Sequence, residues 1–402
     1  MLTLKAIKEA AFLLEGVVRR TPLVYSHSYS QMAQADVYLK AENLQRTGSF
    51  KVRGAYVKMA HLPPEDRKAG VITASGGNHA QGVALAGRRL GIPTTIVMPV
   101  DAPLAKVTAT RNRGAEVILK GAVFDQAQVY ARRLQRQRGL TFIPAFDDYL
   151  VMAGQGTIAL EILADLPDLD LILVPVGGGG LISGIALAAK ELRPSLRVVG
   201  VQAAAAPAAA HSFIHGRRET CPASTTIADG IAIQRPGRLT FRFIQKYVDE
   251  VVTVGEEDIS HAMVMLLERS KLVVEGAGAV GLAALLSGRV KAQGLKVAVL
   301  LSGGNVDINL VARIINHGLS IAGRYLILRT RLPDRAGQLF RLLSRLAETR
   351  VNIINIQHRR ERPGLPLGQA EVELTLETRD AGHRREVMEL LKSGGYEVNI
   401  DQ

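Results

Sequence analysis

Hydrophobic and polar positions divide most of the chain into alternating short strands and helices. The pattern predicts strands at residues 70–74, 94–98 and 116–119 and helices at 78–90, 103–113 and 124–138. It continues with helices at 154–164, 182–192 and 257–272 and strands at 171–176, 197–202 and 296–301. Short apolar strands separated by helices of this length are typical of a parallel sheet covered on both faces. We therefore predict two α/β units side by side.

The chain before residue 62 is predicted to form a helix at 4–18, a strand at 37–41 and a helix at 52–61. Ser49 is expected to cap the third of these elements, which places Lys51 in its first turn. A cation is disfavoured at a helix N-terminus, so the amine is more easily kept neutral and able to form an imine with a carbonyl. The alternative is a surface lysine on a solvated helix face.

The order of predicted strands and helices changes near Ala322 and Gly323. Strands are predicted at residues 325–331, 351–358, 370–377 and 396–400, with helices at 337–348 and 384–392. This βαββαβ order is that of a ferredoxin-like domain of about 80 residues. We place the domain boundary between residues 321 and 322, with a smaller α/β subdomain at about 50–145 inserted into the first region.

Composition describes an ordinary globular protein, with 47% hydrophobic and 22% charged residues among 402. Cys221 is the one cysteine, which excludes an internal disulfide and fits a reducing cytoplasm. One cysteine and nine scattered histidines show no zinc-type spacing, so no metal site is expected. We expect neither a signal peptide nor a membrane span, because the N-terminus is amphipathic and the apolar runs are short.

A formal net charge of +13 raises the question of nucleic-acid binding. The basic residues are spread along the chain, and aromatic residues, which would stack on bases, make up only 4%. A basic solvated surface is the favoured interpretation, with no nucleic-acid partner.

Glycine-rich stretches follow three of the predicted strands. Gly177 to Gly180 precede a helix, so their N–H groups and the helix N-terminus suit a phosphate. The spacing fits neither a dinucleotide fingerprint nor a nucleotide P-loop, and a flexible turn is the alternative. Ser75-Gly-Gly-Asn-His79 suits a carboxylate, and the third stretch is Ser302-Gly-Gly-Asn305. All three are expected beyond the carboxyl ends of strands, where ligands of open α/β sheets bind.

Together, Lys51 and these loops require a ligand with a carbonyl and a phosphate that acts on a carboxylate-bearing substrate. Pyridoxal 5'-phosphate acting on an amino acid meets each requirement. Over essentially its whole length the chain resembles the fold type II (tryptophan synthase β-like) family of pyridoxal phosphate enzymes, and among them the threonine ammonia-lyases. The Ser49-Phe-Lys51, Ser75-Gly-Gly-Asn-His79 and tetraglycine motifs occur in the family's order.

The resemblance assigns roles to these residues. It implies that Lys51 carries the cofactor as a Schiff base and removes the α-proton, and that Phe50 packs beside the ring. Ser302 is expected at the pyridine nitrogen, where a hydroxyl favours β-elimination over transamination, and Glu275 is expected to line the site. Asn78 is expected to contact the ring hydroxyl, and Lys51 and Ser75 are expected to be the catalytic residues. The phosphate is expected to bind Gly177, Gly178, Gly179, Gly180 and Leu181. The substrate carboxylate is expected to bind Ser75, Gly76, Gly77, Asn78 and His79.

The resemblance implies elimination of L-threonine to 2-oxobutanoate and ammonia, and of L-serine to pyruvate. Two departures separate the chain from metal-binding relatives and serine racemases. Residues 202–208 offer no carboxylate, so elimination is expected to need no divalent metal. Gly76 stands where a racemase needs a serine, so no racemisation is expected. The alternatives are a serine-preferring dehydratase or racemase, and an amino-acid sensor with an idle catalytic half.

The C-terminal unit resembles an ACT domain, an amino-acid-binding regulatory module. The match lies in the first strand–helix turn, from Leu332 to Leu339. We expect a free amino acid to bind where two copies pair, in a homodimer or homotetramer, near Asp334, Gly337, Asn352 and Asn355. A dimer module without a ligand is the alternative, and neither the effector nor a biosynthetic or catabolic role follows from the sequence.

Overall fold

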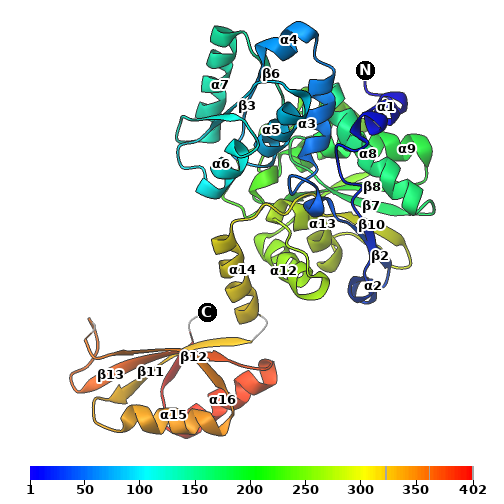
Figure 1. The fold of residues 1–402 in the computed structure, drawn as a ribbon. Helices are drawn as coiled ribbons and strands as arrows, with labels where there is room; N and C mark the ends of the chain where they lie inside the picture. Colours follow the sequence, from blue (N-terminus) through cyan, green and yellow to red (C-terminus); the bar gives the residue numbers. More distant parts are fainter. Residues whose placement is uncertain (322–323, 362, 401–402) are drawn as a thin grey trace. The chain divides into compact units, whose positions relative to one another are not determined.

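The computed structural model describes residues 1–321, 324–361 and 363–400. The chain divides into two compact units, Met1–Val306 and Asp307–Gln402 (Figure 1). Ala322 and Gly323, where the order of predicted strands and helices changes, lie outside the described residues. The domain boundary between residues 321 and 322 therefore stays a prediction, and helix α14 (Ile308–Ile321) falls in the second unit.

The larger sheet of the first unit has six strands in the order β1-β2-β10-β7-β8-β9. All neighbours are parallel except β1 and β2. The strands are β1 (Leu23–Tyr25), β2 (Asp36–Lys40), β7 (Leu171–Pro175), β8 (Arg197–Ala203), β9 (Glu250–Val254) and β10 (Lys296–Leu300). The central strands are buried on both faces, so they read as continuous apolar runs.

Helices cover both faces of this sheet. Ile172 and Val174 of β7 pack in one core with helices α1, α8, α9 and α11, whereas Gly281 of α13 approaches Leu173 and Val299 on the other face. The helices are α1 (Leu4–Leu14), α2 (His27–Ala33), α8 (Tyr149–Asp165), α9 (Gly180–Leu192), α10 (Ala208–Ile214), α11 (Arg238–Tyr247), α12 (Glu256–Met265) and α13 (Gly276–Leu286), with short turns η1 (Glu42–Leu44), η2 (Asp229–Ile231) and η3 (Leu266–Ser270).

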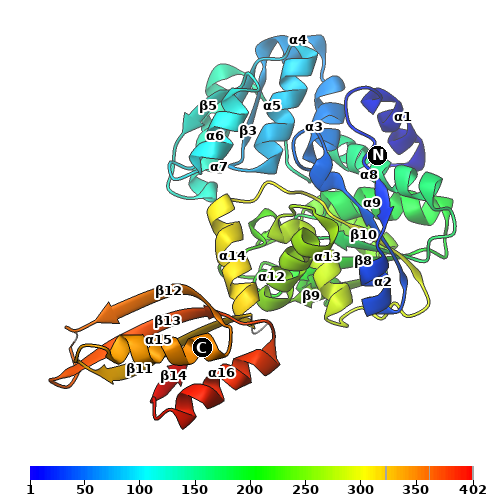
Figure 2. The same ribbon diagram turned by 60° about the horizontal axis from the view of Figure 1, so that its bottom comes forward.

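The smaller sheet is fully parallel, in the order β5-β4-β3-β6. Val71 and Ile96 face a core shared with α3 and α5, while Ile72 and Val97 face α7. Figure 2 shows α3, α5 and α7 around this sheet. This alternation follows from the two-residue period of a strand. The elements are α3 (Lys51–Ala60), α4 (Pro64–Ala69), β3 (Val71–Ala74), α5 (Asn78–Leu90), β4 (Thr94–Met98), α6 (Leu104–Arg111), β5 (Glu116–Leu119), α7 (Phe124–Arg138) and β6 (Thr141–Phe142).

The second unit contains an antiparallel sheet in the order β12-β13-β11-β14. Alternate residues of β11, such as Leu326 and Leu328, are buried with Leu342 of α15 and Val387 of α16. The elements are β11 (Tyr325–Pro333), α15 (Gln338–Glu348), β12 (Asn352–Arg359), β13 (Gln369–Glu377), α16 (Ala381–Ser393) and β14 (Val398–Ile400). The predicted fold class, two parallel-sheet units and a ferredoxin-like βαββαβ unit, is confirmed.

Several local predictions are wrong. The helix predicted at 4–18 ends at Leu14, and the one predicted at 154–164 begins at Tyr149. Ser49 does not cap α3: the capping position is Phe50, in helical conformation and without a side-chain cap, because the backbone of Ser49 pairs with Gly303 instead. The helix predicted at 257–272 ends at Met265 and continues as a π-helical turn through Ser270. Among the described helices, none is both long and apolar enough to cross a membrane.

Candidate active site

Lys51 is the first residue of α3, and the residues before it are tied to the end of β10. Ser49 forms a β-bridge with Gly303, and the Phe50 amide donates to the Ser302 carbonyl at 3.1 Å. The backbone of Gly304 in turn donates to Gly48 at 2.9 Å. These bonds hold the lysine beside the third glycine loop although about 250 residues separate them in the chain.

The Lys51 side chain is partly buried. Nζ donates to the carbonyl of Ala145 at 3.3 Å and is 5.1 Å from the centre of the Phe50 ring. Burial lowers the pKa of this amine to about 8, against the opposing effect of the Glu275 charge. Desolvation is therefore the main reason why the neutral, nucleophilic form is accessible, whereas the sequence prediction relied on the helix terminus alone.

The tetraglycine loop joins β7 to α9 and has no room for side chains. A Cβ on Gly178 would lie 2.4 Å from the ring of Phe146, and one on Gly180 would lie 2.9 Å from the Phe146 Cα. Gly179 has φ +95°, which only glycine adopts readily. The Gly178 carbonyl accepts hydrogen bonds from Gly237 N (3.1 Å) and Thr240 Oγ1 (2.7 Å), which fix the loop.

This loop leads directly into the first turn of α9, at Gly180 and the buried Leu181. The N–H groups of a first helical turn have no partner within the helix, and the helix dipole adds partial positive charge there. Packed glycines in front of a helix N-terminus are thus well suited to a phosphate group.

The loop between β3 and α5 carries the residues proposed for the substrate carboxylate. Ser75 Oγ accepts a hydrogen bond from Gly77 N at 3.2 Å, and α5 begins at Asn78. A Cβ on Gly76 would come no closer than 3.8 Å to any neighbour, Pro99, so this position is open. The first-turn N–H groups of α5 suit an anion, and carboxylate binding at this loop stays a prediction.

The His79 side chain is directed into the core rather than into the loop. Its Nε2 lies 3.1 Å from the carbonyl of Ile143, and the residue is buried. Burial, and then the charge of Lys51, lower the pKa of the imidazole to about 3, so it stays neutral. The His79 side chain is therefore not available to an anion. A contact of the His79 backbone N–H with the substrate carboxylate stays a prediction.

Asn78 and Glu275 meet in the same site. Asn78 Nδ2 donates to Glu275 Oε1 at 2.6 Å, while Asn78 Oδ1 accepts from Asn305 Nδ2 at 2.8 Å. Asn305 Nδ2 also donates to the carbonyl of Thr47 at 2.7 Å. Burial, followed by the charge of Asp229, raises the pKa of Glu275 to about 7 although the Asn78 amide opposes this.

Ser302 completes this side of the site. It is buried at the end of β10, and its carbonyl receives the Phe50 amide. The sequence prediction did not give a role to Asn305, although it lies in the same Ser-Gly-Gly-Asn stretch. Its partners are distant in the chain, so only the fold shows its use.

The residues present fit pyridoxal phosphate. Among the described side chains, Ser49 Oγ, two residues before Lys51 in the chain, is buried without a hydrogen-bond partner, so it has an unused donor and acceptor. The tetraglycine loop has no side chains to cover its backbone N–H groups, because a Cβ there would clash with neighbouring residues. The lowered pKa of Lys51, about 8, makes its neutral amine accessible. An anion site, a nucleophilic amine and an unpaired hydroxyl together match a phosphorylated aldehyde.

The predicted effector residues lie within the second unit. Gly337, with φ +85°, precedes α15, and Asp334 pairs with Arg360 at 3.2 Å. Asn352 Nδ2 donates to Glu377 at 3.1 Å, and Asn355 follows a β-bulge in β12. The first turn of α15 and this bulged strand are therefore described, while their role in ligand binding stays a prediction.

The expectation of no metal site stays a prediction, although one histidine pair does have a spacing that could suit a metal ion. His211 and His215 are four residues apart at α10, and Glu219 returns to them, so three ligand atoms lie within 4.8 Å of one another. The stretch at 202–208 gives no such group: Gln202 Oε1 caps α10 by accepting from the amides of Ala209 and Ala210.

Comparisons with known proteins agree with this geometry. The family described as pyridoxal-phosphate dependent enzyme matches residues 14–303, and the ACT domain family matches residues 326–393. The L-threonine ammonia-lyase of Thermotoga maritima is 52% identical over 400 residues, covering 100% of both chains. Threonine deaminase isoform 2 from Solanum lycopersicum has a TM-score of 0.75 at 37% identity, covering 78% of this chain and 92% of that one. Maize serine racemase has a TM-score of 0.75 at 37% identity, with 80% and 98% covered.

Proposed function

The chain belongs to the pyridoxal-phosphate dependent enzymes, and from this premise we propose that it eliminates ammonia from L-threonine to give 2-oxobutanoate. The observation that carries the proposal is the amine of Lys51, at the start of α3, which donates to the Ala145 carbonyl and is held beside the Ser302–Asn305 loop by the backbone bonds of Ser49 and Phe50. The full-length identity with an L-threonine ammonia-lyase supports the same reaction. L-Serine, which lacks only the γ-methyl group, is the second expected substrate and gives pyruvate.

The residues that would hold the cofactor are those described above. Gly177 to Gly180 and Leu181 would hold the phosphate, Asn78 the ring hydroxyl, and Ser302 the ring nitrogen. When bound, pyridoxal phosphate supplies an aldehyde for the amino group and a conjugated ring that spreads the electron pair left by the α-proton. Phe50 lies beside the lysine and would border the ring.

The protein's own part in the reaction is proton transfer and orientation. Lys51 Nζ, neutral above its lowered pKa of about 8, accepts the α-proton as a general base. The loop from Ser75 to His79 orients the substrate carboxylate through backbone N–H groups at the N-terminus of α5. Ser75 accepts the Gly77 amide and so shapes the loop. Orientation of the α-hydrogen toward Nζ is the main requirement for the step.

Serine racemisation is the second candidate, because a racemase has a similar structure. Racemisation requires a proton donor on the face of the substrate opposite Lys51. Gly76, at the position where the resemblance expects that donor, has no side chain. We therefore propose that elimination is the chain's reaction and that racemisation is negligible.

The second unit is an ACT domain, which implies that it binds an amino acid. We propose that this ligand binds at an interface between two copies of the unit, in a homodimer or homotetramer, with its carboxylate at the first turn of α15. Gly337 gives the backbone the open turn that such a site needs. We further propose that the enzyme acts in the cytoplasm, which agrees with its single cysteine.

Steady-state rates with L-threonine and L-serine test the reaction. Formation of 2-oxobutanoate and pyruvate is followed by coupled reduction, and the enantiomers of serine are separated by chiral chromatography. We expect both oxo acids and no D-serine above the non-enzymatic level. If D-serine forms as fast as pyruvate, the enzyme is a racemase. If neither oxo acid forms while the second unit binds an amino acid, the chain is a sensor and the proposal fails.

A further inference from the structure

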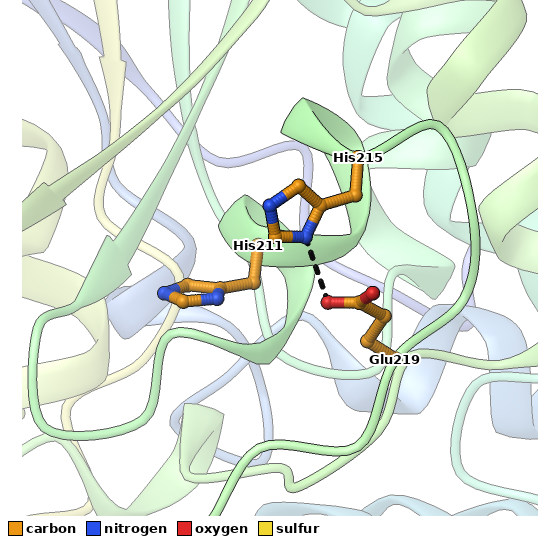
Figure 3. A group of neighbouring side chains, drawn as sticks. All are labelled: His211, His215 and Glu219. Carbon is orange, nitrogen blue, oxygen red and sulfur yellow. Dashed lines mark hydrogen bonds and ion pairs between the residues drawn. The ribbon is translucent and has the colours of Figure 1, made fainter.

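A group of two imidazoles and one carboxylate lies on the surface at α10, apart from the residues proposed for catalysis. His211 is in the last turn of α10, and His215 is its C-terminal cap. Residues four apart share one face of a helix, so both rings are on the same side. The chain then turns back: Glu219 N donates to Ser212 Oγ at 2.9 Å, which brings the Glu219 carboxylate to the two rings (Figure 3).

The distances within the group are short. His215 Nδ1 lies 2.8 Å from Glu219 Oε2, and one ligand atom from each of the three residues lies within 4.8 Å of the others. The two rings have centroids 5.8 Å apart and planes at 86°, so they do not stack. Figure 3 shows the His215 ring joined to the Glu219 carboxylate, with the His211 ring beside this pair.

We propose that His211, His215 and Glu219 bind one divalent transition-metal ion of the zinc type, with solvent as the remaining ligand. Two imidazole nitrogens and one carboxylate oxygen are a donor set that Zn²⁺ accepts at about 2.0–2.2 Å, whereas Mg²⁺ prefers oxygen. Tetrahedral bonds of this length place ligand atoms about 3.3 Å apart. Side-chain rotation therefore suffices to close the group around an ion.

The positive charge of Arg217 disfavours binding of a cation at this site. Arg217 Nε donates to the other carboxylate oxygen, Glu219 Oε1, at 2.9 Å. This bond leaves Oε2 to the metal but places a positive charge nearby. The site is also open, since about half of the His215 side chain and 23% of the Glu219 side chain are exposed. We therefore infer a regulatory or structural ion that exchanges with solvent.

The proposed metal site lies at the start of a segment that leads to the active site. The segment that follows runs from Gly216 past Cys221 and Ser224, which bond to Gln234 and Ala205. It then packs against the active site: a Cβ on Gly276 would lie 2.3 Å from the Ile227 carbonyl, and one on Gly177 would lie 3.0 Å from the Ile231 Cα. An ion that joins α10 to Glu219 would anchor the beginning of this segment, which borders the phosphate loop.

Calorimetry on the untagged holoenzyme, stripped with a chelator, tests the site with zinc chloride alone and with magnesium chloride alone. We expect one zinc ion per chain and at least tenfold weaker zinc binding in His211→Ala and in His215→Ala. The control is His261→Ala, an exposed histidine of α12, which should bind zinc as the unmodified protein does. Magnesium should bind at least tenfold more weakly than zinc.

Hydrogen exchange gives a readout that does not depend on activity. Zinc should slow exchange at residues 216–228 in the unmodified protein and in His261→Ala, but not in His211→Ala. The exposed position of both histidines predicts that the metal-free variants keep their fold and elimination rate, which circular dichroism and turnover would check. Absence of zinc binding, equal binding by the double variant His211→Ala/His215→Ala, or equal affinity for magnesium would overturn the proposal.

Discussion

Asn78 donates its side-chain amide to Glu275 Oε1 at 2.6 Å, although 197 residues separate the two in the chain. The orientation of this amide is set from its other end, where Asn305 Nδ2 donates to Asn78 Oδ1 and to the Thr47 carbonyl. With its oxygen engaged in this way, Asn78 directs its Nδ2 toward Glu275. Asn305 is thus a positioning residue for the amide that would meet the ring hydroxyl.

The first prediction concerns Asn305→Ala. Loss of this partly buried hydrogen-bond partner costs about 1–2 kcal/mol, so cofactor affinity should fall about 5- to 30-fold as Asn78 becomes free to rotate. Titration of the apoenzyme with pyridoxal phosphate, followed by visible absorbance, measures the effect. Asn309→Ala, an exposed asparagine of α14, is the matched control. Equal affinity in the two variants would show that Asn305 does not position Asn78.

The second prediction follows from the Lys51 pKa of about 8. Below this pH the amine is a cation and cannot attack the cofactor aldehyde, so the rate constant for attachment should fall tenfold per pH unit. Above it the rate should level off. The Glu275 charge raises the pKa of Lys51, so Glu275→Gln should move the inflection to lower pH. Stopped-flow absorbance of the apoenzyme measures it, with the exposed Glu65→Gln as control.

Two results would contradict this account of Lys51. The first is an inflection that stays in place, or rises, in Glu275→Gln. The second is the wrong site of attachment: borohydride reduction and peptide mapping should find the pyridoxyl group on Lys51, and a label on another lysine excludes the assignment. Lys51→Ala should lose elimination almost entirely, because it removes both the attachment point and the base.

The third prediction is that Gly178→Ala abolishes the phosphate cradle. The added methyl group would lie 2.4 Å from the Phe146 ring, so the loop or the ring must move, at a cost of about 1–3 kcal/mol. Cofactor affinity and melting temperature should both fall. The double variant Gly178→Ala/Phe146→Ala removes the clashing ring and should recover part of the affinity. If Gly178→Ala alone binds cofactor normally, the packing of this loop does not define the site.

The fourth prediction uses the open position at Gly76. A serine there meets nothing closer than Pro99, at 3.8 Å from its Cβ, so Gly76→Ser should fold normally. Its hydroxyl is expected to permit slow D-serine formation from L-serine, together with a lower elimination rate. Chiral chromatography measures both products, and Gly76→Ala separates the hydroxyl from the added bulk. D-Serine from the alanine variant at an equal rate would exclude the hydroxyl as donor.

Strongly periodic segments were predictable from the sequence. The bounds predicted for α5, α7, β4 and β5 agree with the structure. Amphipathic helices and short apolar strands alternate in this region, and glycines and prolines between them mark where they end. Helix α13 was not predicted: its residues are uniformly apolar and buried all round, which leaves no periodic signal. Helix α11 was also not predicted, although it is amphipathic.

The candidate site was predictable wherever a local motif carries the chemistry. Lys51 and the glycine loops each stand in a short recognisable stretch, whereas the Asn305 bonds and the unpaired Ser49 hydroxyl depend on residues brought together by the sheet. The Ser49 cap was predicted wrongly because pairing with Gly303 outweighed the local preference. The spacing of His211 and His215 was visible, but only the turn to Glu219 completes the group.

The last prediction concerns regulation by the ACT domain. Gly337 and Gly364 both have φ +85°, and a Cβ added to either would meet no atom within 4 Å, so alanine imposes the same backbone strain at both positions. Only Gly337 precedes α15, the helix whose first turn is proposed to hold the effector carboxylate. Gly337→Ala should weaken the response to branched-chain amino acids by at least fivefold, within the usual coupling of about 1–3 kcal/mol, and leave basal turnover unchanged. Gly364→Ala should respond normally. If no amino acid binds to the unmodified enzyme by calorimetry, or if both variants respond alike, this turn is not the effector site and the domain serves assembly alone.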